Sequence, residues 1–145
     1  RKRLVRSGGK MGVLIVDLDL VKRINDNWGH AVGDLALVEI ARVLKDSVRT
    51  YDGVARWGGE EFLVGMFDLS CFAELEAVAN NLLNAVRQVR LDCHGVDVSL
   101  TYSIGGILAD ASVSLDEIIK QADDALYRAK NEGRDRAVLA NFLPA

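Results

Sequence analysis

A run of four apolar residues, three of them β-branched, most constrains how this chain can fold. Val13-Leu14-Ile15-Val16 shows no alternation of polar and apolar side chains, and such a run is typical of a strand buried on both faces. The run leads directly into Asp17-Leu18-Asp19. We therefore expect a central strand that carries acidic side chains where it ends.

Apolar spacing in the rest of the chain predicts helices and strands around this strand. Helical periodicity covers residues 37–48, 71–89 and 118–129, and strands are expected at residues 54–57, 62–64, 96–104 and 137–139. Ser114 and Glu117 form a capping box that opens the last helix, and Gly133 ends it. The order predicts an α+β domain with a ferredoxin-like, palm-type central antiparallel sheet, a β-α-β-β-α-β core with extensions, flanked by helices.

Composition limits the class of protein. At 145 residues the chain fits one domain, and half of its residues are apolar. A formal net charge of −3 argues against general nucleic-acid binding, and no apolar run approaches the roughly 20 residues of a membrane span. Cys71 and Cys93 lack metal-ligand spacing and are expected to be reduced thiols of a cytoplasmic protein. Because the chain begins at Arg1, we expect residues 1–145 to be the C-terminal part of a longer protein.

The segment Arg56-Trp57-Gly58-Gly59-Glu60-Glu61-Phe62 joins two predicted strands. A Gly-Gly pair there predicts a tight hairpin turn, because glycine accepts positive φ. The absent side chains would also let a ligand approach the backbone. The adjacent carboxylates suit a hard cation such as Mg²⁺. The alternative is a hairpin with two solvated acids.

Asp17 and Asp19 lie two residues apart, so in a strand both side chains point to the same side. A carboxylate at the end of a buried strand is costly unless it is paired or binds a cation. Asp17 is therefore a candidate metal ligand that Glu60 could join, and divalent cations there would polarise a phosphate. The alternative is that the two acids cap the following helix.

The segment from Lys22 to Asp34 is rich in Asn, Asp and Gly, which predicts an interrupted helix or a shaped loop. Asn25 and Asp34 could recognise a purine edge, because a carboxylate can accept from the N1–H and the amine of guanine. His30 alone is better explained as a structural residue than as a base.

Lys130 and Arg134 lie four residues apart near the end of the last helix. Cations are favourable at a helix C-terminus in any case, but they could also neutralise a triphosphate. No Walker-type glycine loop, nucleophilic triad or zinc spacing occurs in the sequence.

These segments together resemble the GGDEF family, the diguanylate cyclases. The matching residues, in chain order, are Asp17-Leu18-Asp19-Leu20-Val21-Lys22, Ile24-Asn25-Asp26, Gly29-His30, Gly33-Asp34, Arg56, Gly58-Gly59-Glu60-Glu61-Phe62, Ser103-Ile104-Gly105, Ala122-Asp123, Ala125-Leu126-Tyr127-Arg128-Ala129-Lys130 and Gly133-Arg134. The resemblance implies that two GTP molecules condense to cyclic di-GMP with release of two pyrophosphates. The active unit would be an antiparallel homodimer, controlled by an upstream sensory or regulatory domain. Whether the parent protein is membrane-bound stays open, and no membrane contact by this domain is expected.

The resemblance also implies roles for individual residues. Asp17, Glu60 and the carbonyl of Leu18 would bind Mg²⁺ or Mn²⁺, with Glu60 also the proton acceptor and Glu61 supporting the metal site. The guanine would be read by Asn25 and Asp34 with His30 nearby. Lys22 would stabilise charge on the phosphates, Lys130 and Arg134 would hold the β- and γ-phosphates, and Gly58 and Gly59 would leave room for the nucleotide.

Arg49-Thr50-Tyr51-Asp52 stands where family members carry an Arg-x-x-Asp product-inhibition site. The resemblance implies that Arg49 and Asp52 bind cyclic di-GMP as an inhibitor. Two features depart from the family: Val21 stands where Phe is usual, and the Asp-x-Leu-Thr segment found upstream is missing. The alternative functions are a catalytically weak signalling module that binds GTP or cyclic di-GMP, and a palm-type enzyme for another nucleotide.

Overall fold

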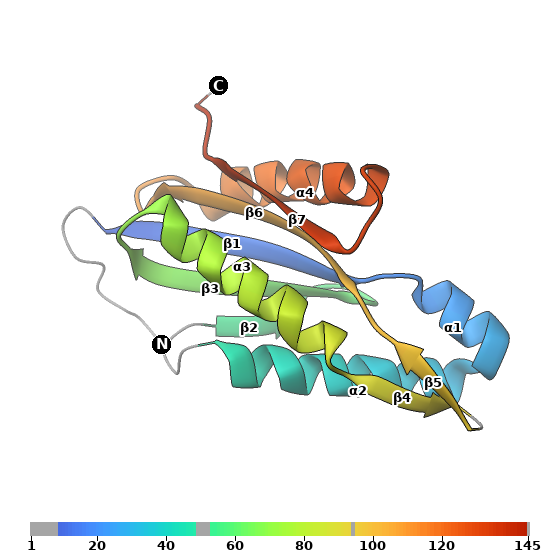
Figure 1. Ribbon diagram of the computed structural model, residues 1–145. Helices are drawn as coiled ribbons and strands as arrows, with labels where there is room; N and C mark the ends of the chain where they lie inside the picture. The colour runs from blue at the N-terminus through green and yellow to red at the C-terminus, as the bar shows by residue number, and fades with distance from the viewer. Residues whose placement is uncertain (1–8, 49–52, 94, 145) are drawn as a thin grey trace.

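The computed structural model describes residues 9–48, 53–93 and 95–144. The elements in chain order are β1 (Lys10–Leu18), α1 (Val21–Trp28), α2 (His30–Ser47), β2 (Gly53–Arg56), β3 (Glu61–Leu69), α3 (Phe72–Arg87), β4 (Arg90–Cys93), β5 (Val96–Ser99), β6 (Tyr102–Asp110), α4 (Leu115–Asn131) and β7 (Arg136–Asn141). Figure 1 shows a main sheet with helices packed against it, and the short strands β4 and β5 paired apart from it.

The main sheet has five strands in the order β2-β3-β1-β6-β7, with β1 in the centre. The predicted antiparallel core is confirmed, because β1 pairs antiparallel with both β3 and β6, and β2 pairs antiparallel with β3. β7 joins β6 in parallel, so the sheet as a whole is mixed. The α4 crossover between β6 and β7 is the connection that a parallel pair requires.

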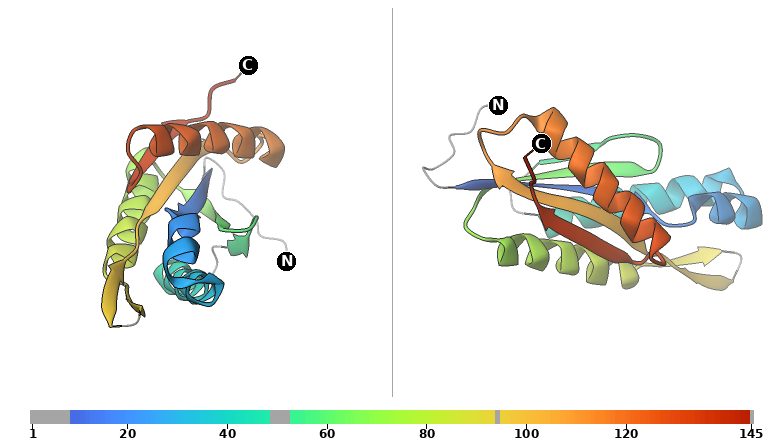
Figure 2. Two further views of the ribbon diagram at one scale, coloured as in Figure 1. Left: turned by 90° about the vertical axis from the view of Figure 1, so that its right-hand side faces the viewer. Right: turned by 90° about the horizontal axis from the view of Figure 1, so that it is seen from above.

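Both faces of β1 are covered, as its apolar sequence predicts. Leu14 and Val16 belong to a core shared with the helices α1, α2 and α3. Val13 and Ile15 belong to a second core that packs under α4. Figure 2 shows α4 on one side of the sheet and the other helices on the opposite side. All four side chains are fully buried.

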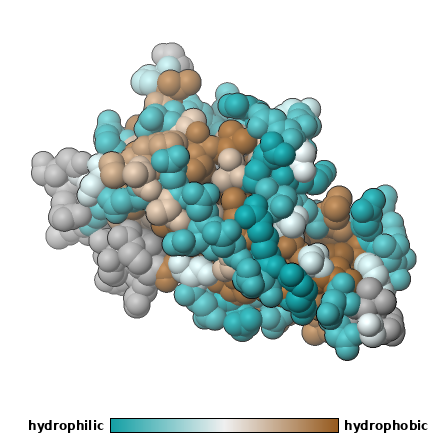
Figure 3. Space-filling view, in the orientation of Figure 1, coloured by the Kyte–Doolittle hydropathy of each residue, from teal (hydrophilic) through white to brown (hydrophobic). Residues whose placement is uncertain are grey.

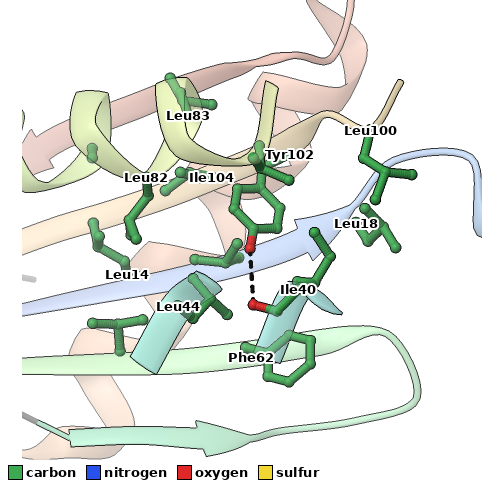
Figure 4. Close-up of a cluster of buried hydrophobic side chains, with 14 of the residues drawn as sticks. Leu14, Leu18, Ile40, Leu44, Phe62, Leu82, Leu83, Leu100, Tyr102 and Ile104 are labelled. Atoms are coloured by element: carbon green, nitrogen blue, oxygen red, sulfur yellow. Dashed lines mark hydrogen bonds between the residues drawn. The ribbon is translucent and has the colours of Figure 1, made fainter. Parts of the chain in front are cut away.

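Tyr102, the first residue of β6, lies in the larger core. Its ring is fully buried, and its hydroxyl donates a 3.3 Å hydrogen bond to the carbonyl of Ile40 in α2 (Figure 4). Burial raises the pKa of this phenol well above its usual range. The bond satisfies a polar group that would otherwise be costly to bury.

One local prediction is confirmed and two are wrong. The segment 22–34 is an interrupted helix, one of the two predicted alternatives, with α1 followed by α2 and the break at Gly29 (φ 91°). The strand expected over 96–104 is divided into β5 and β6, and β5 forms a two-stranded sheet with β4 that the sequence did not predict. The expected positive φ of the Gly-Gly turn is wrong, because neither Gly58 nor Gly59 has one.

The signals predicted for the last helix are confirmed. Ser114 is the N-cap of α4, and its hydroxyl accepts a 3.3 Å hydrogen bond from the backbone N–H of Glu117. The helix ends at Asn131, and Gly133 follows with a φ of 124°. In the part of the chain that is described, no helix combines the length and the apolar character needed to cross a membrane.

Gly105 sets the distance between α4 and the sheet, which yields a testable prediction. A Cβ at this position would lie 2.2 Å from the backbone nitrogen of Leu126 and 2.3 Å from the carbonyl of Ala122. Because helix backbone cannot move aside as a side chain can, we expect Gly105→Ala to cost about 3 kcal/mol of unfolding free energy or more. The melting temperature should fall by roughly 10 °C.

Gly65→Ala is the matched control, since Gly65 lies in β3 and an added Cβ there meets no atom of the described residues within 4 Å. Thermal unfolding followed by circular dichroism measures both variants. Equal destabilisation by the two substitutions would contradict the close approach of α4 to Gly105.

Candidate active site

The end of β1 places Asp17 in a buried position with an unsatisfied oxygen. Asp17 is 4% exposed, and its Oδ2 forms an ion pair with Nζ of Lys130 from the last turn of α4. Its Oδ1 is buried and has no hydrogen-bond partner among the described residues. A buried acceptor of this kind is costly unless a ligand satisfies it.

The surroundings of Asp17 disfavour its charge. Burial raises the pKa of its carboxyl to about 6. The ion pair with Lys130 opposes this shift, and the neighbouring carboxylates Glu60 and Glu61 add to it. Three acids without a sufficient counter-charge are the electrostatic setting in which a divalent cation binds favourably.

The turn between β2 and β3 brings Glu60 beside the end of β1. Asp17 lies opposite Glu61 in the register of β1 and β3, and the N–H of Leu18 donates to the carbonyl of Glu60 over 3.4 Å. The guanidinium of Arg56 donates from Nε and Nη2 to the carbonyl of Gly59, over 3.1 and 2.5 Å. The turn is therefore held at both ends, and the side chain of Glu60 remains exposed.

Gly58 and Gly59 have open space around them. A Cβ at either position would meet no atom of the described residues within 4 Å, and neither backbone needs glycine for its φ. The described part of the fold therefore does not require glycine at either position, and the space beside both residues is open to a ligand.

A cleft of about 590 Å³ joins these groups. Its lining residues come from the end of β1, from α1, from the β2–β3 turn and from the end of α4: Asp17, Leu18, Leu20, Val21, Lys22, Arg23, Asp26, Asn27, Glu60, Lys130 and Arg134. Figure 1 shows these segments meeting at one end of the sheet. Carboxylates and cations that line the same cleft suit a metal-bound phosphate compound.

The residues of this cleft suit Mg²⁺ that is shared with substrate and water, rather than a metal ion held by protein ligands alone. Among residues 9–48, 53–93 and 95–144, no group of three His, Cys, Asp or Glu side chains is placed to hold a metal ion. Mg²⁺ typically uses one or two carboxylates together with substrate phosphates and water. Asp17, with its unsatisfied Oδ1, and Glu60 supply such a pair.

The two residues predicted to read a base lie where α1 meets α2. Asn25 of α1 points at Gly33 of α2, because a Cβ on Gly33 would lie 1.8 Å from Asn25 Oδ1. That oxygen is buried without a partner in the described part of the chain. Asp34, the next residue along α2, lines a cavity of about 470 Å³ between α2 and the strands β2 and β3. Because Gly33 has no side chain, Asn25 can lie against the backbone of α2 next to Asp34.

Other predicted site residues have different positions. His30 is the exposed first residue of α2 and lines neither cavity. Arg49 and Asp52 lie outside the described residues. The idea that Asp17 and Asp19 cap the following helix is wrong, because the N-cap of α1 is Leu20 and no side chain caps it.

Val21, the departure from the family pattern, is buried in the larger core and also lines the cleft.

Sequence reasoning named Arg56 and Asp19 in its motifs but missed how they organise the site. Arg56 fixes the β2–β3 turn, and Asp19 ties three segments together behind the cleft. The partner of Arg56 lies three residues away in the same motif, whereas the partners of the Asp19 side chain lie 82 to 116 positions away. The only local signal for Asp19 is its position, two residues from Asp17 on the same side of a buried strand.

Comparison with known proteins identifies the family of this chain. The family described as "Diguanylate cyclase, GGDEF domain" matches residues 1–136. "Diguanylate cyclase A" of Treponema denticola is 38% identical over 136 residues, covering 92% of this chain and 36% of that protein. The chain thus spans about a third of the length of this curated relative.

Solved structures agree in fold. The diguanylate cyclase SiaD of Pseudomonas aeruginosa, in complex with its activator SiaC, is 35% identical with a TM-score of 0.87, over 93% of this chain and 52% of that one. The GGDEF domain of DgcB from Caulobacter crescentus, in complex with c-di-GMP, is 26% identical with a TM-score of 0.85, over 92% of this chain and 79% of that one. The chain therefore belongs to the GGDEF family of diguanylate cyclases.

Proposed function

We propose that this chain condenses two molecules of GTP into cyclic di-GMP and releases two pyrophosphates. The observation that carries the proposal is the cleft at the end of β1. There Asp17, whose buried Oδ1 has no hydrogen-bond partner among the described residues, and the exposed Glu60 line one cleft with the cations Lys22, Lys130 and Arg134. This combination of acids and cations suits a triphosphate with its metal.

The cations would bind the triphosphate. Lys130 and Arg134 approach the cleft from the end of α4 and the turn after it, and Lys22 approaches from α1. Lys130 is paired with Asp17 in the structure, so a metal on Asp17 would release its ammonium group to the β- and γ-phosphates. Asp17 would exchange the ammonium group of Lys130 for the metal ion and would keep a counter-charge. This exchange limits the free-energy cost of burying several charges in one cleft.

Asp17, Glu60 and the backbone carbonyl of Leu18 would hold Mg²⁺. When bound, the metal supplies polarisation of the α-phosphate and lowers the pKa of the attacking hydroxyl. Glu61, opposite Asp17 in the sheet, would add negative charge behind this site.

The reaction forms one bond and breaks one bond in each half. The 3′-oxygen of one GTP attacks the α-phosphorus of the other, the bond from that phosphorus to pyrophosphate breaks, and the 3′-hydroxyl proton passes to Glu60. Lys22 would stabilise the charge that develops on the phosphate oxygens. Repetition in the opposite sense closes the ring and releases the second pyrophosphate.

A homodimer follows from the proposed stoichiometry. The acids and cations described above form one such cleft at one end of the sheet. If each cleft holds one GTP, a second copy of the chain must present the second GTP in an antiparallel arrangement. An upstream domain that brings two copies together would then control the activity.

Asn25 and Asp34 would select guanine. The carboxylate of Asp34 can accept from the N1–H and the exocyclic amine of guanine, a pair of donors that adenine lacks. The unsatisfied Oδ1 of Asn25 is a further acceptor beside it. His30, the exposed first residue of α2, would lie near the bound guanine.

A turnover assay tests the proposal. Purified protein with GTP and Mg²⁺ should produce cyclic di-GMP and pyrophosphate in a ratio of one to two, detected by chromatography, and ATP should give no comparable product. Absence of product from a confirmed dimer with bound GTP would contradict the enzyme and favour a binding module. Preference for ATP would contradict the role of Asp34.

The same assay, with cyclic di-GMP added at the start, tests product inhibition. We propose that Arg49 and Asp52 bind the product, since an Arg can grip phosphate with two donors and stack on guanine. Inhibition that Arg49→Ala relieves would support this site. Inhibition that persists unchanged in that variant would exclude it.

A further inference from the structure

Asp19 is a buried acid that the proposed chemistry does not use. Its side chain is 1% exposed. Oδ1 accepts a 2.6 Å hydrogen bond from the hydroxyl of Ser103, and Oδ2 accepts from the hydroxyl of Thr101 over 2.6 Å and from the backbone N–H of Asp135 over 3.0 Å. The guanidinium of Arg134 lies 3.7 Å from Oδ1.

These contacts use the carboxylate fully. Two oxygens offer about four acceptor positions, and Asp19 has three hydrogen bonds and one cationic neighbour. Asp17 differs because one of its oxygens is buried and has no hydrogen-bond partner within residues 9–48, 53–93 and 95–144. Asp19 is therefore suited to hold other groups in place rather than to bind a metal.

The turn held by Asp19 has an unfavourable backbone. Arg134 and Asp135 are consecutive non-glycine residues with φ values of 64° and 48°, and Gly133 before them has a φ of 124°. Side-chain-bearing residues adopt this region only when surrounding contacts enforce it. Removing the acceptor for the N–H of Asp135 would therefore free the turn to relax.

A second contact secures the same turn from outside. Arg87 at the end of α3 donates from Nε to Oδ1 of Asp135 over 2.9 Å and from Nη2 to its carbonyl over 3.2 Å. Figure 3 shows a strongly hydrophilic strip on the face where the end of α3 meets the turn after α4. Asp19 holds the turn from the buried side and Arg87 holds it from the surface.

We propose that Asp19 is a positioning residue for the triphosphate, because it holds Arg134 and its turn where the guanidinium faces the cleft. The inference rests on the proposed function, in which Arg134 meets the β- and γ-phosphates. In that arrangement the acids at the end of β1 and just after it correspond in pairs with cations at the end of α4 and in the turn after it, Asp17 with Lys130 and Asp19 with Arg134. The first pair would separate on metal binding, and the second pair would stay.

Nucleotides that differ in phosphate number test the proposal. We expect Asp19→Asn to weaken binding of a non-reactive methylene analogue of GTP about tenfold, while the dissociation constant for GMP changes less than about twofold. KM for GTP should rise more than kcat falls. Asp46→Asn is the control, since it removes an exposed acid that pairs with Arg42 on α2.

Dependence on Arg134 separates positioning from general damage. If Asp19 acts through Arg134, the double variant with Arg134→Ala should bind the analogue no more weakly than Arg134→Ala alone. Thr101→Val and Ser103→Ala each remove one donor to Asp19, and each should show the same pattern at a smaller amplitude. Thr101→Val carries the test if Asp19→Asn fails to fold by circular dichroism.

Two results would overturn the inference. If Asp19→Asn weakens the binding of GMP and of the triphosphate analogue equally, the substitution damages the whole site. If the binding of both nucleotides is unchanged, Asp19 has no role in binding. Failure of the proposed function is a distinct result: wild-type protein that binds the analogue but forms no cyclic di-GMP leaves the binding comparison valid. Wild-type protein that binds neither nucleotide contradicts both proposals.

Discussion

Glu60→Gln should abolish cyclic di-GMP formation, lowering the rate by at least about a hundredfold, and leave the fold intact. Glutamine keeps the size of the side chain but can neither accept the 3′-hydroxyl proton nor bind Mg²⁺ as an anion. The exposed Glu60 side chain adds little to stability, whereas its backbone carbonyl, which accepts from Leu18, is unchanged. Product formation over a range of GTP and Mg²⁺ concentrations measures the effect.

The matched control is Glu76→Gln, which changes an exposed acid of α3 away from the cleft. We expect this variant to retain full activity and the Glu60 variant to retain its melting temperature. Substantial cyclic di-GMP production by Glu60→Gln at saturating Mg²⁺ would show that another group accepts the proton. Loss of folding in that variant would show that the turn depends on the carboxylate.

The sequence predicts those parts of the fold that depend on local periodicity. The apolar run Val13–Val16 is a central strand covered on both faces, and the capping box at Ser114 begins α4 as expected. Such features need only residues near one another in the chain. They place the strand end, and therefore Asp17, without any knowledge of the rest of the molecule.

Features that depend on distant partners were not predicted. The strand expected over 96–104 breaks before Tyr102 because Thr101 turns toward Asp19: its carbonyl accepts from the N–H of Asp19 over 3.0 Å, and its hydroxyl donates to the Asp19 carboxylate. Apolar alternation alone carries no information on a contact across 82 positions. The left-handed turn at Arg134 and Asp135 has the same origin.

In the candidate site, too, local motifs predict some features and not others. They predict Asp17, Glu60, Lys130 and Arg134 as site residues, and the structure brings these four to one cleft. The sequence predicts that the Gly-Gly turn needs glycine for its backbone, but neither residue has a positive φ, and an added Cβ would meet no atom of the described residues within 4 Å. Neither turn propensity nor packing within the described residues therefore explains these two glycines.

Mg²⁺ binding should weaken about tenfold between pH 7 and pH 5 because of Asp17. Burial raises the pKa of this carboxyl to about 6, so roughly nine-tenths of it is ionised at pH 7 and roughly one-tenth at pH 5. An Asp with an ordinary pKa would lose almost no charge over this range. Titration of Mn²⁺ as a paramagnetic substitute, in the presence of the non-reactive GTP analogue, measures the affinity.

Lys130→Met should move the midpoint of this titration to higher pH, because the ion pair with Lys130 lowers the pKa of Asp17. A midpoint that stays in place would contradict the ion pair.

The same carboxyl links pH to stability with a definite sign. Its folded-state pKa lies above the ordinary value of 3.8, so the native state binds the proton more tightly than the unfolded state does. This group's contribution to the unfolding free energy therefore falls as pH rises from about 4 to about 6. Above pH 6 and without metal, Asp17→Asn should raise the melting temperature. Mg²⁺ should stabilise the wild-type protein but not this variant, and a metal-induced shift of equal size in both would exclude Asp17 as a ligand.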